Sequence, residues 1–144
     1  MHFTVNLALA FSAFLGGSTL QPNETIVIQP FMPAQTVEEY VREYFVDVPV
    51  MAAIAKCESR FRRYDKNGSV LRGEVVYEDV GVMQVNETYH KAAATELGLN
   101  LTVIQDNVAY ARYLYDKKGT QPWNSSKACW GRTAEAKAHF ALNK

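Results

Sequence analysis

Glu58, in the stretch IAKCESRF, is the side chain best placed to do chemistry. Met51, Ile54 and Glu58 are spaced so that all three lie on one face of a helix, which carries the carboxyl group toward an apolar core. A carboxyl desolvated in this way has a raised pKa and can act as a general acid near neutral pH. An ion pair with Lys56 or Arg62 would instead lower the pKa and leave Glu58 with a structural role.

Two further segments follow ESRF along the chain. GVMQ begins at Gly81, and NVAYARYLY begins at Asn107. The three segments together resemble those of the soluble, lysozyme-like lytic transglycosylases. In that family an E-S-x-F segment carries the catalytic glutamate, a G-x-M-Q segment follows it, and an asparagine opens a helix of the form N-x-x-x-A-x-Y-L. The resemblance covers residues 48–130.

The resemblance implies roles for five residues. Glu58 is the implied catalytic acid, and Ser59 is implied to orient it or the substrate. Gly81 is implied to let the backbone approach the sugar closely, while Met83 and Gln84 line the cleft. Simpler roles stay open for three of them, because Gly81 suits a tight turn, Met83 a core position and Gln84 a helix cap.

The end of the domain departs from the family pattern. Many relatives have a Tyr-Asn-x-Gly segment whose tyrosine approaches the catalytic carboxyl, whereas this chain reads GTQPWNSSKACWGR. Trp123 and Trp130 either form a wall on which sugars stack or pack in the core, and Trp123 is our candidate for the ligand contact. Tyr110 and Tyr113, on the helix of the third segment, are candidates to contact the substrate and to supply the missing hydroxyl.

The implied reaction is cleavage of the β-1,4 bond between N-acetylmuramic acid and N-acetylglucosamine in peptidoglycan. Glu58 would protonate the glycosidic oxygen and then take a proton from the muramyl 6-hydroxyl, which gives 1,6-anhydromuramyl ends.

A hydrolase with two carboxylates would need a second acid across the bond. Glu74, Glu78 and Asp79 are candidates, and Asp79 is the first choice, although it also suits capping of the next turn. A hydrolytic lysozyme or chitin-directed glycosidase is therefore one alternative. A glycan-binding module with weak catalysis is another.

The N-terminal part predicts export. FTVNLALAFSAFLGGS is an apolar run that ends in small residues, so we predict a signal peptide over residues 1–18. Three prolines in QPNETIVIQPFMPAQ predict a linker over residues 19–35. We expect a chain exported to the periplasm, cell envelope or extracellular space, with no stable membrane span after processing. A docked or disordered N-terminal arm is the alternative.

The chain has two cysteines, Cys57 and Cys129. In an oxidising compartment such a pair is expected to form a disulfide, which would fix the residue next to Glu58 to the segment WNSSKACW. Two buried free thiols are the alternative. The scattered histidines show no metal-ligand spacing, so we expect neither a metal nor a cofactor.

The fold is predicted to be mainly α, a lysozyme-like (α+β) domain over residues 36–144 with a small β-hairpin excursion. The length of 144 residues and the 48% of hydrophobic residues suit one domain with a real core. Capping boxes are predicted at Thr36 and Thr102, a hairpin turn at Asn67 and Gly68, and a helix end at Gly98.

Charge limits the classes of partner. The chain carries 15 basic and 15 acidic residues, and this balance does not predict nucleic-acid binding. The resemblance implies peptidoglycan glycan strands as the partner. By analogy with short members of the family, it also implies a scaffold of a secretion machine. We expect the chain to act as a monomer.

Overall fold

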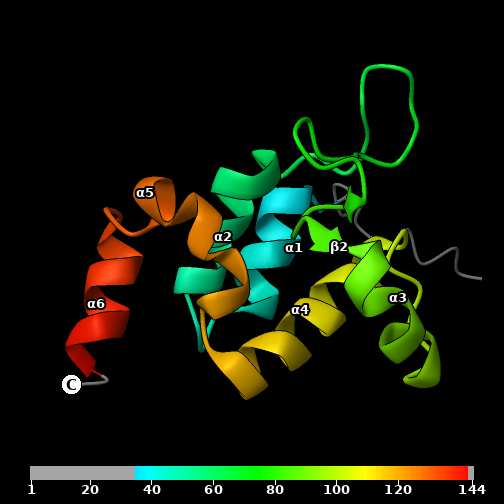
Figure 1. The fold of residues 1–144 in the computed structure, drawn as a ribbon. Coiled ribbons are helices and arrows are strands. Elements are labelled where there is room, and N and C mark those ends of the chain that lie inside the picture. The colour runs from blue at the N-terminus through cyan, green and yellow to red at the C-terminus, as the bar shows by residue number, and fades with distance from the viewer. Residues whose placement is uncertain (1–34, 143–144) are drawn as a thin grey trace, which may run out of the picture. The chain divides into compact units, whose positions relative to one another are not determined.

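The computed structural model describes residues 35–142, which belong to a single compact unit (Figure 1). The predicted signal peptide and all but the last residue of the predicted linker lie outside the described residues. Within residues 35–142, no helix is both long enough and apolar enough to cross a membrane.

The first two helices form as the sequence predicts. Helix α1 spans Val37–Tyr44 and begins with the predicted capping box, in which the Thr36 side chain accepts from the Glu39 N–H and the Glu39 carboxylate accepts from the Thr36 N–H. Helix α2 spans Val50–Ser59 and is buried along most of its length. It packs against α1 and against the three C-terminal helical segments, so it forms the centre of the core.

The β excursion is short and lies between α2 and the next helix. Strand β1, Asp79–Val80, pairs in an antiparallel manner with β2, Val85–Asn86. The predicted turn at Asn67 and Gly68 is present, with Gly68 at a φ of +79° and the Asp65 carboxylate accepting from the Asn67 N–H. Only an isolated bridge flanks this turn, so the paired strands lie further along the chain than predicted.

Helices α3, Glu87–Glu96, and α4, Ile104–Lys118, follow the excursion. The predicted capping box at Thr102 is wrong. Helix α4 begins after Val103 with no side-chain cap, and the Thr102 hydroxyl donates to the Asn100 side chain, 2.8 Å away. Asn100 competes successfully because its short side chain forms a local turn with the residue two positions on.

Three helical segments close the domain. They are η1, Gln121–Ser126, then α5, Lys127–Trp130, and α6, Ala134–Leu142. The Trp130 indole is fully buried and donates to the Trp123 carbonyl, which ties α5 to η1. The described part of the chain is thus mainly helical with a two-stranded antiparallel hairpin, as predicted at that level.

Candidate functional site

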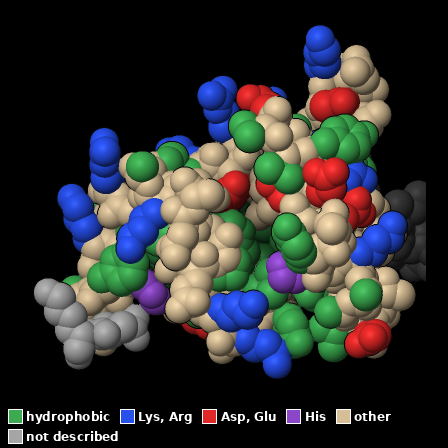
Figure 2. Space-filling view, viewed as in Figure 1, with side chains coloured by type: hydrophobic (Ala, Val, Ile, Leu, Met, Phe, Trp, Pro, Cys, Tyr) green, Lys and Arg blue, Asp and Glu red, His purple; other side chains and the backbone are tan. Residues whose placement is uncertain are grey.

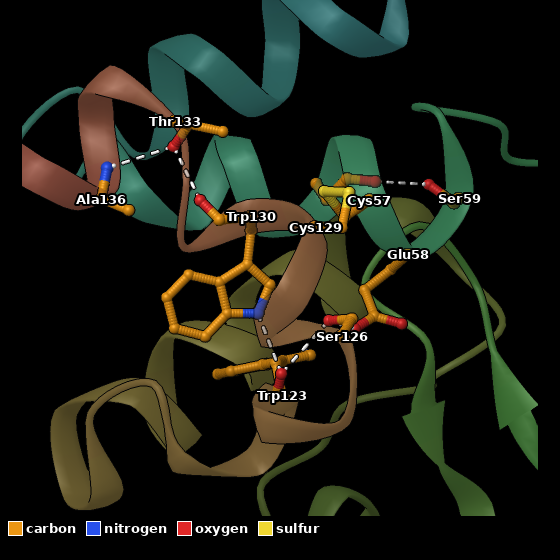
Figure 3. The surroundings of a disulfide bond; sticks show 10 residues. Cys57, Glu58, Ser59, Trp123, Ser126, Cys129, Trp130, Thr133 and Ala136 are labelled. Atoms are coloured by element: carbon orange, nitrogen blue, oxygen red, sulfur yellow. Dashed lines mark hydrogen bonds between the residues drawn. A yellow bond between two sulfur atoms is a disulfide. The ribbon is translucent and has the colours of Figure 1, made fainter.

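Glu58 lies in the last turn of α2, beside a disulfide that joins this helix to α5 (Figure 3). Cys57 and Cys129 are bonded, with their Cα atoms 6.0 Å apart, which confirms the predicted pairing. Because Cys57 directly precedes Glu58, the bridge holds the catalytic candidate against the segment that contains Ser126. The two segments are 72 residues apart in the sequence.

The Glu58 carboxyl group has one hydrogen-bond donor and no cationic partner within residues 35–142. The Ser126 hydroxyl donates to Glu58 Oε1 over 2.5 Å, as Figure 3 shows. Arg62 instead donates to the Ser59 carbonyl, and Lys56 is exposed. The ion pair of Glu58 with Lys56 or Arg62 is therefore absent from this part of the chain.

Burial dominates the electrostatics of Glu58. Desolvation raises its pKa above the ordinary value, and the charge of Asp79 adds to this rise, while the hydrogen bond from Ser126 acts in the opposite direction. The net direction is upward. The carboxyl group thus favours its protonated form more strongly than an exposed glutamate, which is the state a proton donor requires.

The carboxyl group opens on a cleft of about 690 Å³. Figure 2 shows the corresponding face, with a hollow floored by hydrophobic side chains and acidic side chains gathered above it and to its right. The lining side chains come from α2, the β excursion, α3, the end of α4 and η1. Three of them are carboxylates, Glu58, Glu78 and Asp79. The polar and aromatic lining residues include Gln84, Asn86, Tyr89, His90, Lys118, Gln121 and Trp123.

Two of the predicted substrate contacts line this cleft. Gln84 has a positive φ of 49°, and its side-chain amide donates to the Gly81 carbonyl over 2.8 Å, so its position is fixed by its own turn. Trp123 is 3% exposed and donates from Nε1 to the Met83 carbonyl over 2.9 Å. The Trp123 ring thus packs in the core and also contributes to the cleft wall, and its role as a sugar contact stays a prediction.

Five predicted site residues do not line the cleft: Ser59, Gly81, Met83, Tyr110 and Tyr113. Ser59 is 1% exposed, and its hydroxyl donates to the Ala55 carbonyl within α2, so it is not available to a ligand. Met83 is a fully buried core residue. Gly81 faces Asn107, since a Cβ added to it would lie 2.6 Å from Asn107 Nδ2. For Met83 and Gly81 the structure therefore supports the simpler core and turn roles.

Tyr110 and Tyr113 do not supply the hydroxyl at Glu58. The Tyr110 ring is buried, its hydroxyl lies 3.2 Å from His90 Nδ1, and burial raises the pKa of Tyr110 while it lowers that of His90. Tyr113 packs on Tyr110 with ring centroids 5.4 Å apart. The hydroxyl that reaches Glu58 belongs to Ser126, within the segment GTQPWNSSKACWGR.

Asn107 was not predicted as a site residue, yet its hydrogen bonds connect the segments beneath the cleft. Its side chain is fully buried and accepts from the Met83 N–H over 3.0 Å, while Nδ2 donates to the carbonyls of Val80 and Leu101. These bonds fix α4 to the segment that carries Gln84. The signal was present in the sequence, because Asn107 opens the third segment of the resemblance.

Further residues of the cleft were also missed. Tyr89, in the first turn of α3, is 79% exposed and presents an aromatic ring in the cleft. His90, Lys118 and Gln121 line the same space. Their helical positions carry no sequence signal that separates a cleft from any other solvated surface.

Asp79, the first choice for a second carboxylate, lines the cleft and accepts from the Asn86 side chain over 2.8 Å. Among residues 35–142, no group of three or more histidine, cysteine, aspartate or glutamate side chains is arranged to hold a metal ion. Comparison of the chain with protein-family models, with curated proteins and with solved structures finds no match.

Proposed function

We propose that this chain is a peptidoglycan lytic transglycosylase with a lysozyme-like catalytic domain. One observation carries the proposal: the Glu58 carboxyl is partly buried, has no cationic partner in the described part of the chain and opens on a cleft large enough for sugar rings. The order of the three sequence segments supplies the substrate class. Exposed Tyr89 adds an aromatic face of the kind on which pyranose rings stack.

In the proposed reaction, protonated Glu58 donates its proton to the glycosidic oxygen, and the bond to the anomeric carbon of N-acetylmuramic acid breaks. The resulting carboxylate then takes the proton of the muramyl 6-hydroxyl, whose oxygen bonds to the anomeric carbon. The products are a free 4-hydroxyl and a 1,6-anhydro ring, and no water is consumed. Glu58 ends in its protonated form, ready for the next cycle.

The Ser126 hydroxyl suits both halves of this cycle. It lies 2.5 Å from Glu58 Oε1 and 3.2 Å from the Trp123 carbonyl, and it has one proton to give. While Glu58 is a carboxylate, the proton stabilises Oε1. When Glu58 is protonated, the hydroxyl can turn to the Trp123 carbonyl without leaving its place.

A hydrolytic glycosidase is the second candidate, and Asp79 is the observation that favours it. Asp79 lines the same cleft, and its charge raises the pKa of Glu58. A second carboxylate in this position could hold a water or stabilise an oxocarbenium ion. Its products would carry one more water than anhydro ends.

The proposed substrate implies export, which the signal peptide predicted over residues 1–18 would provide. The proposed place of action is the periplasm or cell envelope, with glycan strands as the substrate of a monomeric enzyme. Docking to a secretion-machine scaffold is an extension of the same proposal and rests on family analogy alone.

Digestion of purified sacculi, followed by mass spectrometry of the released fragments, tests the proposal. The wild-type chain should release anhydromuramyl ends, and Glu58→Gln should lower turnover to less than about a hundredth, because the amide cannot donate the proton. Glu78→Gln, the same change at an exposed carboxyl of the same cleft, is the matched control. Hydrated reducing ends would assign the hydrolase, and activity retained in Glu58→Gln would reject both candidates.

A further inference from the structure

The charges in the cleft are separated. Glu58, Glu78 and Asp79 lie among the lining residues from α2 and the β excursion, whereas Lys118 comes from the end of α4. Figure 2 shows basic side chains at the lower edge of the hollow and acidic side chains above it. The charge of Asp79 acts on Glu58, and the charge of Lys118 acts on His90. One end of the cleft is therefore suited to repel anions and the other to bind them.

Lys118 is free to bind a ligand. It is exposed, lines the cleft, and makes no ion pair within residues 35–142. The adjacent Lys117 differs, since its ammonium lies 4.8 Å from the centroid of the Tyr113 ring and it does not line the cleft. The two lysines share the last turn of α4 and its dipole, so they differ in their relation to the cleft and in the contact of Lys117 with Tyr113.

The neighbours of Lys118 offer uncharged donors. Gln121 is exposed and contributes a side-chain amide to the cleft. Burial and Lys118 both lower the pKa of His90, which favours the neutral ring. When the Tyr110 hydroxyl donates to Nδ1 of that ring, the ring proton lies on Nε2, which then acts as a donor. A lysine with flanking neutral donors is suited to a carboxylate.

We infer that the Lys118 end of the cleft binds a carboxylate carried by the side group of the muramyl sugar. This inference rests on the proposed function. Muramyl sugars differ from N-acetylglucosamine by a lactyl ether, whose carboxylate is free in stripped glycan and joined to a peptide in intact glycan. The peptide carries carboxylates of its own. Chitin has neither, so this site selects muramyl glycans over chitin.

Affinity measurements in the Glu58→Gln background test the inference, because that variant binds without cutting. The ligands are three glycans of equal length: a chito-oligosaccharide, amidase-stripped glycan and peptide-bearing glycan. Lys118→Gln should weaken binding of a carboxylate-bearing glycan about fivefold at low salt, the upper range for a solvent-exposed ion pair, and leave the chito-oligosaccharide unchanged. Lys117→Gln removes the same charge one residue away and should leave all three affinities unchanged.

The pattern of losses identifies the source of the carboxylate. A loss with stripped glycan assigns the lactyl carboxylate, and a loss confined to peptide-bearing glycan assigns the peptide. The fivefold difference should shrink as salt is raised. Equal losses for all three ligands, no loss for any, or no glycan binding at all would overturn the inference. Selective binding together with a wild-type chain that cuts no sacculi would keep the inference and reject the proposed enzyme.

Discussion

Replacing Asn107 with alanine should cost about 3 to 4.5 kcal/mol of unfolding free energy, because three buried hydrogen bonds are lost at about 1 to 1.5 kcal/mol each. The three partners are the Met83 N–H and the carbonyls of Val80 and Leu101, at 2.9 to 3.0 Å. Each partner is a backbone group in the core, where few other groups could replace the lost hydrogen bond. The loss would exceed that of most single substitutions.

Gly81 makes this prediction sharper through a double-mutant cycle. A Cβ at position 81 would lie 2.6 Å from Asn107 Nδ2 and 2.9 Å from Oδ1, and its φ of +74° costs a non-glycine residue about 1 to 2 kcal/mol. Gly81→Ala alone should therefore cost the backbone strain plus the clash. In the Asn107→Ala background the clash is gone, so the double variant should lose less than the sum of the two single variants.

Urea denaturation, followed by the fluorescence of buried Trp123 and Trp130, measures these costs with the disulfide intact. Asn124→Ala, the same change at an exposed asparagine, is the control and should alter stability by less than about 0.5 kcal/mol. A cost below about 1 kcal/mol for Asn107→Ala would refute the reasoning, since it would mean that water satisfies the three groups. Strict additivity in the cycle would refute the contact between residues 81 and 107.

Three further predictions concern the surroundings of Glu58. Loss of the disulfide in Cys57→Ala/Cys129→Ala should cost about 4.4 kcal/mol for the 72-residue separation, measured by denaturation. Reduction should also lower activity before helicity falls; parallel loss of both would give the bridge a purely structural role. In the wild type, the hydrogen bond from Ser126 lowers the pKa of Glu58. Ser126→Ala removes this bond, so the pKa should rise and the alkaline limb of the kcat/KM profile should move to higher pH. Asp79→Asn should move it to lower pH and change the rate by less than about tenfold, whereas a loss of about a hundredfold with hydrated products would indicate a two-carboxylate hydrolase.

The sequence predicted best the elements whose formation depends on residues close together in the chain. The capping box at Thr36 requires contacts only three residues apart, and it forms as expected. The spacing of Met51, Ile54 and Glu58 correctly predicted a buried helix, because the helical period alone places apolar side chains on one face. The disulfide was predictable because the chain has two cysteines, which leaves one pairing.

One error was local, because Asn100 takes the Thr102 hydroxyl that the predicted capping box requires. The other differences arose where long-range contacts decide. Gly81 and Met83 were assigned to the cleft on motif position, but only the approach of Asn107, 24 residues after Met83, places them in the core. The bond from Ser126 to Glu58 spans 68 residues and depends on a bridge that aligns two segments. Tyr110 was a reasonable candidate for that bond from sequence alone. The Tyr110 hydroxyl instead lies beside His90 of α3.

Glu58 itself should reduce the stability of the fold at neutral pH. In the unfolded chain it titrates near its ordinary value of 4.5, and in the folded chain its pKa is raised, chiefly by desolvation. Between these two values the folded state binds more protons than the unfolded state, so the stability contributed by this group falls as pH rises. Below about 4.5 the group is protonated in both states and imposes no such cost.

Glu58→Gln should therefore be more stable than wild type at neutral pH, although we expect it to be inactive. The amide carries no charge to desolvate, and its oxygen can still accept from the Ser126 hydroxyl. In thermal denaturation across pH, the stability gap should be small under acidic conditions and widen as pH rises above 4.5. Glu78→Gln, the same change at an exposed carboxyl of the same cleft, is the comparison variant. A gap that is independent of pH would mean that the carboxylate is solvated in the folded state, and Glu58 would then lack the desolvation on which its proposed role as a proton donor rests.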